Sequence, residues 1–269
     1  MNTVQDRKFK IGDPILEVNN ISLSFGGVNA ITDTSFNVLE HEVRAIIGPN
    51  GAGKSSMLNC INGIYKPQQG SIAFKGNTLS KITPNIIAQM GISRTFQNLA
   101  LFKRMSAIDN ILVGRKLHSK ANFIDVAFQL PKARKEEKLN LKKCEEIVEF
   151  LEIEKIKNTP VGKLPYGLQK RVELGRALAM NPEIVLLDEP AAGMNSEETE
   201  DIARFIIDLH EERKKTVILV DHDMNMVMDI AERVMVLNFG EKLAEGTPKE
   251  IVVDENVIEA YLGGKWLWR

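Results

Sequence analysis

The sequence has little of what marks an extracellular, zinc-binding or membrane-spanning protein. Only two of its 269 residues are cysteines. Cys60 and Cys144 form no CxxC pair, which argues against a disulfide framework or a zinc site. The opening stretch MNTVQDRKFKIGDP lacks the apolar core of a signal peptide, and no apolar run approaches the roughly 18 residues of a spanning helix. We therefore expect a cytoplasmic chain that lies at a membrane only where a partner holds it there.

An excess of charge of one sign is also lacking. The chain carries 35 basic and 36 acidic residues, for a formal net charge of -1. This balance argues against a general polyanion binder, so we expect no nucleic acid partner. The length suits one large α/β domain or two small ones, and no internal repeat or low-complexity linker divides the chain. We expect a single domain over residues 1–269.

Short apolar runs rich in β-branched residues predict the central sheet. They lie at residues 42–47, 183–188, 216–221 and 233–238. Almost every position in them is apolar, as in strands that are buried on both faces. The runs alternate with helical patterns, so the sequence predicts an α/β fold with a mostly parallel sheet covered by helices.

Two segments have the spacing of amphipathic helices. The first follows NSEE, which supplies a cap and an acidic first turn, and its apolar stripe is Ile202, Phe205, Ile206 and Leu209. The second lies near residues 132–152, and its apolar stripe is Leu141, Cys144, Val148 and Leu151. We expect the first helix to pack on the sheet and the second to be a solvated helix with one buried face.

The stretch GPNGAGKS, Gly48 to Ser55, matches the phosphate-loop pattern G-x-x-x-x-G-K-[ST] completely. A predicted strand precedes it and a predicted helix follows it. The glycines let the backbone curl, so that successive N–H groups and the helix N-terminus face phosphate oxygens. Lys54 would reach the β- and γ-phosphates, and the hydroxyl of Ser55 would bind Mg²⁺. The predicted contacts of the nucleotide are Gly48, Pro49, Asn50, Gly51, Ala52, Gly53, Lys54, Ser55 and Ser56.

A second motif, IVLLDEP at residues 184–190, ends a predicted buried strand in two adjacent carboxylates. Side chains alternate along a strand, so Asp188 and Glu189 should point in different directions. Asp188 suits the shell of Mg²⁺, and Glu189 suits polarising the water that attacks the γ-phosphate. Alone, such a pair is more often a helix cap. Beside a complete phosphate loop, we expect it to be catalytic.

Together these motifs resemble the nucleotide-binding subunit of an ATP-binding cassette transporter, along nearly the whole chain. RTFQ, ending at Gln97, is similar to the glutamine loop of that family, and VDHDM carries His222 where the family has its switch histidine. The resemblance implies that Gln97 contacts Mg²⁺ and water, and that His222 hydrogen-bonds the γ-phosphate. It also implies that Phe25 stacks on adenine.

The resemblance also implies the fold. It is a P-loop NTPase domain of the ATP-binding cassette type, with a mostly parallel core sheet, an antiparallel β subdomain and a helical subdomain. The helical subdomain would cover roughly residues 98–180, and a C-terminal tail roughly residues 240–269. The tail holds both tryptophans, Trp266 and Trp268. They could dock on the domain or form part of an interface, and the sequence does not decide between these.

The family's signature L-S-G-G-Q corresponds to a variant, LPYGLQK at residues 164–170. Leu164 and Gly167 match it, whereas Pro165, Tyr166 and Leu168 do not. In the family this loop contacts the γ-phosphate of ATP held by a second subunit. Pro165 has neither a hydroxyl nor an N–H to offer. Gly167 opens a helix whose dipole still favours phosphate, so we expect it to contact nucleotide across a dimer, in a working but altered ATPase.

The resemblance implies ATP and Mg²⁺ as cofactors, and a homodimer or a heterodimer with a second cassette ATPase. It also implies membrane permease subunits, and indirectly a periplasmic or extracellular substrate-binding protein. The chain would lie at the inner face of the cell membrane. RTFQNLALF, EGTPKEI and AYLG are most similar to ATPases for branched-chain amino acid uptake. Uptake of urea, short amides or small carboxylates is an alternative, as is a partner subunit that binds ATP without hydrolysing it.

Overall fold

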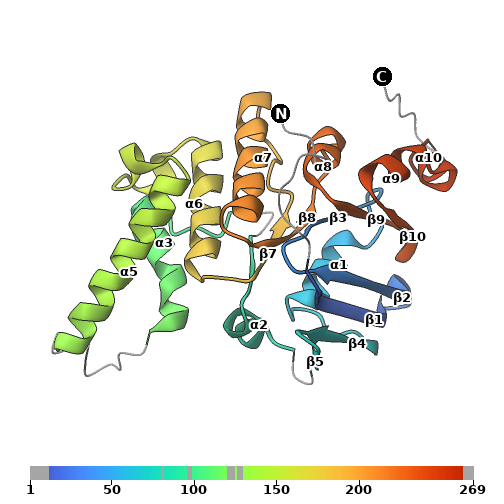
Figure 1. The fold of residues 1–269 in the computed structure, drawn as a ribbon, viewed down its shortest axis with the longest axis horizontal. Helices are drawn as coiled ribbons and strands as arrows, with labels where there is room; N and C mark the ends of the chain where they lie inside the picture. Colours follow the sequence, from blue (N-terminus) through green and yellow to red (C-terminus); the bar gives the residue numbers. More distant parts are fainter. Residues whose placement is uncertain (1–11, 80–81, 96–98, 120–124, 126–129, 263–269) are drawn as a thin grey trace.

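The computed structural model describes residues 12–79, 82–95, 99–119, 125 and 130–262. Two sheets form its framework (Figure 1). The smaller sheet is antiparallel, with strand order β2-β1-β4-β5. Its strands are β1 (Pro14–Phe25), β2 (Val28–Leu39), β4 (Gln69–Phe74) and β5 (Asn77–Thr78). This sheet confirms the antiparallel part of the predicted fold.

The larger sheet contains all four predicted strands. Its order is β10-β9-β3-β8-β7-β6, and every neighbouring pair is parallel except β9 with β10. The strands are β3 (Val43–Ile47), β6 (Ile92–Arg94), β7 (Ile184–Asp188), β8 (Thr216–Val220), β9 (Arg233–Asn238) and β10 (Glu241–Gly246). Every residue of β3, β7 and β8 is buried, which explains why these runs are continuously apolar.

Helices cover both faces of this sheet. The longer ones are α1 (Lys54–Ile61), α3 (Ala107–Arg115), α5 (Pro131–Phe150), α6 (Tyr166–Ala179), α7 (Ser196–Glu211) and α10 (Glu255–Leu262). The shorter ones are α2 (Pro84–Met90), α8 (Met224–Ile230) and α9 (Pro248–Val253), with 3₁₀ turns η2 (Lys116–His118), η3 (Glu154–Ile156) and η4 (Val161–Lys163). Helices α3, α5 and α6 gather on the side of the molecule away from the antiparallel sheet (Figure 1).

The core has two parts because successive strand residues face opposite sides of the parallel sheet. On one side, Ile46 packs with α1 and the antiparallel sheet. On the other side, Val43, Ala45 and Ile47 pack with α3, α5, α6, α7 and α8. Helix α1, which follows the predicted phosphate loop, therefore lies in the cluster shared by the two sheets.

The structure confirms one predicted helix and corrects the other. The stripe of α7 is buried, and Asn195 and Glu198 form a capping box at its start. In α5 the prediction for Leu141 was wrong, because 41 % of its surface is exposed. Ile147 takes its place beside Cys144. The buried residues of α5 all lie after Leu141 in the sequence. Leu141 has the helical spacing of the apolar stripe but lies before the part of the helix that packs on the core.

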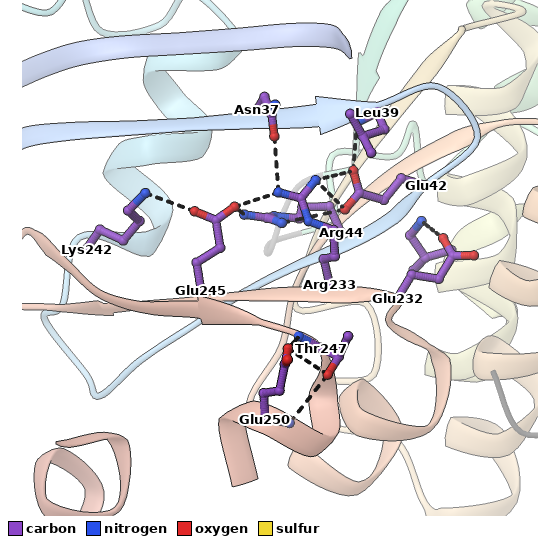
Figure 2. A network of polar contacts seen from close by, with 11 residues as sticks. Asn37, Leu39, Glu42, Arg44, Glu232, Arg233, Lys242, Glu245, Thr247 and Glu250 are labelled. Atoms are coloured by element: carbon purple, nitrogen blue, oxygen red, sulfur yellow. Dashed lines mark hydrogen bonds and ion pairs between the residues drawn. The ribbon is translucent and has the colours of Figure 1, made fainter. Parts of the chain in front are cut away.

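A buried ion network joins the parallel sheet to β2 (Figure 2). Arg44 of β3 is fully buried and lies 3.6 Å from Glu42 and 2.5 Å from Glu245 of β10. Glu245 also pairs with Arg233 at 2.7 Å and Lys242 at 2.9 Å. Arg233 reaches the second sheet through the side chain of Asn37 in β2, at 3.1 Å. Oppositely charged groups thus meet where the sheets join, although Nε and Nη1 of Arg44 donate, and Oε1 of Glu42 accepts, no hydrogen bond among the described residues.

No helix in the described part of the chain is long and apolar enough to span a bilayer. Cys60 and Cys144 are buried free thiols. Burial raises the pKa of Cys60 to about 12 and that of Cys144 to about 11. Trp266 and Trp268 lie outside the described residues, so their role stays open.

Candidate nucleotide-binding site

The predicted phosphate loop connects β3 to α1, in the centre of the parallel sheet. Gly48 and Gly53 have φ values of 150° and 101°. A Cβ on Gly48 would lie 2.1 Å from the carbonyl oxygen of Leu237, and one on Gly53 would lie 2.4 Å from that of Ala30. Both positions therefore need glycine for its conformation and for the space it leaves.

Lys54 opens α1 with its ammonium turned into the loop. Only 6 % of the residue is exposed. Its Nζ donates hydrogen bonds to the carbonyl oxygens of Gly48, at 2.7 Å, and Pro49, at 2.9 Å. Burial lowers the pKa of Lys54, while the negative charges of Glu189 and Asp188 act in the opposite direction. The predicted phosphate-binding cation and the two predicted carboxylates thus share one electrostatic environment.

Asp188 ends β7 as a buried carboxylate with a partner that we did not predict. Its Oδ2 accepts a hydrogen bond from Arg94 at 2.7 Å, and the two side chains are 3 % and 6 % exposed. Arg94 ends β6 and also donates to Asn59 of α1 at 2.6 Å. The Oδ1 atom of Asp188 has no hydrogen-bond partner among the described residues. One carboxylate oxygen is therefore anchored and the other is available.

Glu189 and His222, predicted as catalytic, lie together at the ends of the adjacent strands β7 and β8. The Nε2 atom of His222 lies 2.7 Å from Oε1 of Glu189. A carboxylate only accepts hydrogen bonds, so Nε2 carries the proton. Glu189 has a left-handed backbone, with φ of 50°, and its N–H donates to Val220 of β8 at 2.7 Å. This turn of the backbone separates its side chain from that of Asp188.

Asp221 is a further buried residue that the sequence analysis missed. It precedes His222 and is 4 % exposed. Its carboxylate accepts backbone N–H groups from Ala191 at 3.1 Å, His222 at 2.7 Å and Asp223 at 3.0 Å. Burial raises its pKa, and these hydrogen bonds partly counter the rise. Asp221 thus fixes the loop after Glu189 to the loop that carries His222.

Phe25, the predicted adenine platform, ends β1 with 46 % of its surface exposed. Tyr65 meets it edge-on, with ring centroids 5.0 Å apart and an interplanar angle of 68°. An aromatic ring that is supported from one side and still exposed can stack on a purine. Gln97 lies outside the described residues, so its predicted contact with Mg²⁺ and water stays a prediction.

The variant signature forms the start of α6. Pro165 occupies the N-cap and supplies no side-chain hydrogen bond to the helix. Gly167 is buried against α7, where an added Cβ would lie 2.2 Å from Oε1 of Glu198. Leu168 packs on the main core cluster. Gly167 therefore has a packing role that the sequence analysis did not anticipate, and its contact across a dimer stays a prediction.

A phosphate loop that opens a helix, with acidic side chains at the ends of neighbouring parallel strands, defines a P-loop nucleotide-binding domain. Residues 31–192 match the family model described as ABC transporter. The chain belongs to the ABC transporter family, as the ATP-hydrolysing component of a transporter complex. Residues 241–266 match a second model, described as branched-chain amino acid ATP-binding cassette transporter.

Named relatives agree with this assignment. The chain is 40% identical over 250 residues to the high-affinity branched-chain amino acid transport ATP-binding protein BraF of Pseudomonas aeruginosa, covering 93% of this chain and 98% of that protein. It is 31% identical, with a TM-score of 0.81, to an ABC transporter cassette in its ADP conformation, covering 93% and 99%. A dimeric post-hydrolysis cassette bound to ADP and Pi is 27% identical, with a TM-score of 0.73, covering 87% and 98%.

Proposed function

We propose that this chain hydrolyses ATP to drive uptake of branched-chain or similar amino acids through a membrane permease. The observation that carries the catalytic assignment is the 2.7 Å contact of Glu189 with His222, beside a complete phosphate loop. The relatives' names and the matched C-terminal segment support the choice of substrate. Uptake of urea, short amides or small carboxylates is the alternative within the same mechanism.

Binding begins at the phosphate loop. The loop N–H groups and the N-terminus of α1 face the triphosphate, and Lys54 exchanges its bonds to the carbonyls of Gly48 and Pro49 for phosphate oxygens. Phe25 stacks on the adenine ring. Because Lys54 is already buried in the loop, little of its side-chain freedom remains to be lost when ATP binds.

The residues present fit a magnesium ion. The available Oδ1 of Asp188 and the exposed hydroxyl-bearing Ser55 at the start of α1 are oxygen donors of the kind that Mg²⁺ prefers. Ser55, Asp188 and Gln97 would hold it. The ion neutralises charge on the β- and γ-phosphate oxygens when bound. Arg94 holds the Asp188 carboxylate in place through the 2.7 Å ion pair.

Hydrolysis uses Glu189 as the general base. Its carboxylate takes a proton from the water that attacks the γ-phosphorus, and the bond from that phosphorus to the bridging oxygen of ADP breaks. His222 orients the carboxylate through its Nε2–H and turns toward the γ-phosphate when nucleotide is present. Asp221 ties the loop after Glu189 to the loop that carries His222, by accepting hydrogen bonds from the N–H groups of Ala191 and His222.

The second half of each site comes from another subunit. Gly167 and the N-terminus of α6 face the γ-phosphate of a partner ATPase, either an identical chain or a related one. Because the signature contacts ATP held by the partner, closing the dimer on ATP and opening it after hydrolysis would move the attached permease. The permease receives its substrate from an external binding protein, while this chain stays at the inner face of the membrane.

Mg²⁺-dependent ATP turnover by the purified chain, alone and with its permease, tests this proposal. We expect Glu189→Gln to abolish turnover while ATP binding persists, because the amide cannot accept the proton. Glu197→Gln, in the exposed first turn of α7, is the matched control and should turn over ATP normally. Undiminished hydrolysis by Glu189→Gln would overturn the assignment of the base.

Uptake of labelled leucine by cells that contain the whole transporter tests the substrate. Uptake should depend on this chain and be lost in Glu189→Gln. If labelled urea or acetamide enters in its place, the motor assignment stands and the amino acid assignment fails.

The second candidate function is a subunit that closes on ATP and leaves hydrolysis to its partner. The N-cap position of Pro165 favours it, since proline offers no hydroxyl or N–H to the partner's γ-phosphate. Comparing the wild type with Pro165→Ser decides between the two functions. Turnover that appears only in the serine variant would favour the subunit that leaves hydrolysis to its partner. Equal turnover in both proteins would favour the chain that hydrolyses ATP itself.

A further inference from the structure

Helix α6, which carries the variant signature, lies against the loop that follows Glu189 in the same chain. This loop, residues 189–195, joins β7 to α7. A Cβ on Gly193 would lie 3.4 Å from Cε1 and 3.9 Å from Cζ of Tyr166, the first residue of α6. Gly193 has a φ of 78°, a backbone conformation that favours glycine. The ring of Tyr166 therefore lies over the backbone of the loop at Gly193.

Two further contacts join the first turns of α6 and α7. Gly167 lies against Glu198, and the carboxylate of Glu198 also accepts the backbone N–H of Asn195 at 3.1 Å, as part of the capping box of α7. One turn further along α6, Arg171 donates a hydrogen bond to Asp201 of α7. The starts of the two helices are thus packed together, with the loop 189–195 between the base and this contact.

The loop is short and internally bonded, so its position at Gly193 is linked to that of Glu189. The carbonyl oxygen of Glu189 accepts a hydrogen bond from the N–H of Ala192 at 3.2 Å. The N–H of Ala191 is bound by the carboxylate of Asp221 at 3.1 Å. Gly193 follows Ala192 directly. Asp221 therefore fixes the first half of the loop, and the ring of Tyr166 covers the second half.

A buried charge lies one turn after Tyr166 on the same helix. Lys170 is 4 % exposed and pairs with Glu173 at 3.8 Å. Its Nζ lies 5.9 Å from the centroid of the Tyr166 ring. Lys170 and Glu173 line a small cavity together with Pro190, which directly follows Glu189. Helix α6 thus approaches the loop near Pro190 as well as at Gly193.

We propose that Tyr166 is a positioning residue for the catalytic base of its own subunit: its ring holds the loop at Gly193 and thereby sets the place of Glu189. The inference rests on the proposed role of Glu189 as the base. Helix α6 would then serve both ATP sites, the partner's through Gly167 and its own through Tyr166. A shift of α6 when the partner's ATP binds would reach Glu189 through direct contacts, which would couple the two sites.

Hydrogen exchange on the full chain, without nucleotide, tests the contact. Tyr166→Ala removes the ring, and Tyr166→Phe is the matched variant that keeps it. Peptides that cover residues 189–195 should exchange faster in Tyr166→Ala than in the wild type and in Tyr166→Phe. Exchange in the strands of the parallel sheet should be equal in all three proteins, which shows that the fold is intact. Because no partner ATP is present, this readout reports only on the contact within one chain.

ATP turnover with the permease tests the consequence for catalysis. We expect Tyr166→Ala to lower kcat about tenfold, less than the roughly hundredfold that a misplacement of about 1 Å can cause. The KM for ATP should stay within about twofold of wild type, since the phosphate loop is untouched. Tyr166→Phe should retain the wild-type kcat, because the ring and not the hydroxyl meets Gly193.

Three results would overturn the positioning role. The first is a kcat of Tyr166→Ala within about twofold of wild type. The second is an equal loss of kcat in both variants, which would assign the effect to the hydroxyl. The third is a loss of kcat with unchanged exchange in residues 189–195, which would place the ring at the partner's nucleotide. If the wild type itself does not hydrolyse ATP, the proposed function fails instead, so the two failures are distinguishable.

Discussion

Replacing Glu245 by glutamine would test the ion network between the sheets. The carboxylate receives hydrogen bonds from Arg44, Arg233 and Lys242 (Figure 2). Burial alone would raise its pKa, but the hydrogen bond from Lys242 and the charge of Arg44 outweigh burial and lower the pKa from 4.5 to about 2. This difference between the unfolded and the folded pKa of Glu245 corresponds to about 3 kcal/mol of stability at neutral pH.

The sign of the pH dependence follows from this lowered value. A carboxyl group whose pKa is lower in the folded state stabilises the protein above its unfolded pKa of 4.5, and this contribution is lost as the pH falls toward about 2. Glu245→Gln should therefore lower the free energy of unfolding by about 3 kcal/mol near pH 7, and by much less near pH 3.

Urea unfolding of both proteins at the two pH values measures this difference. Glu241→Gln, at the exposed start of the same strand, is the control and should change stability by less than about 0.5 kcal/mol. A difference between Glu245→Gln and wild type that stays constant across pH, or that is absent near pH 7, would refute the reasoning.

Three further predictions concern the site and its surroundings. Arg94→Ala should lower the free energy of unfolding by about 3–5 kcal/mol, because it leaves the buried Asp188 carboxylate unpaired. Adding Asp188→Asn should recover much of the loss in the same urea assay, and no recovery would contradict the pairing. Gly48→Ala should abolish stabilisation by ATP in a thermal shift assay, since its Cβ would lie 2.1 Å from the Leu237 oxygen; a normal shift would count against this. Cys60, with a pKa raised to about 12 by burial, should react with a thiol reagent only after unfolding, and rapid reaction of the native protein would disprove it.

The sequence predicts well those features whose signal is local. The four buried strands are continuous apolar runs, and the phosphate loop is one contiguous motif between a strand and a helix. The same holds for Glu189 and His222, each of which directly follows a predicted strand. Parallel strands bring their carboxyl ends to one edge of a sheet, and Nε2 of His222 accordingly lies 2.7 Å from Oε1 of Glu189.

Features that depend on pairing between distant segments could not be predicted in this way. Arg94 belongs to the quoted RTFQ motif, yet nothing local indicates that it meets Asp188. Asp221 belongs to the quoted VDHDM motif, yet its hydrogen bond from Ala191 joins two segments that are distant in the sequence. The error at Leu141 has a related cause, because helical periodicity does not tell where a helix leaves the core.

The position of β3 has a consequence for how the chain folds. This strand carries the phosphate loop, and both of its neighbours, β8 and β9, come from the last quarter of the sequence. The N–H of Val43 bonds a carboxylate 189 positions further along the chain. Contacts of such long range close slowly and late. During synthesis, a nascent chain that ends before Thr216 contains the whole phosphate-loop motif and lacks the two strands that flank β3, so we expect the loop to take its shape only after β8 and β9 have been translated.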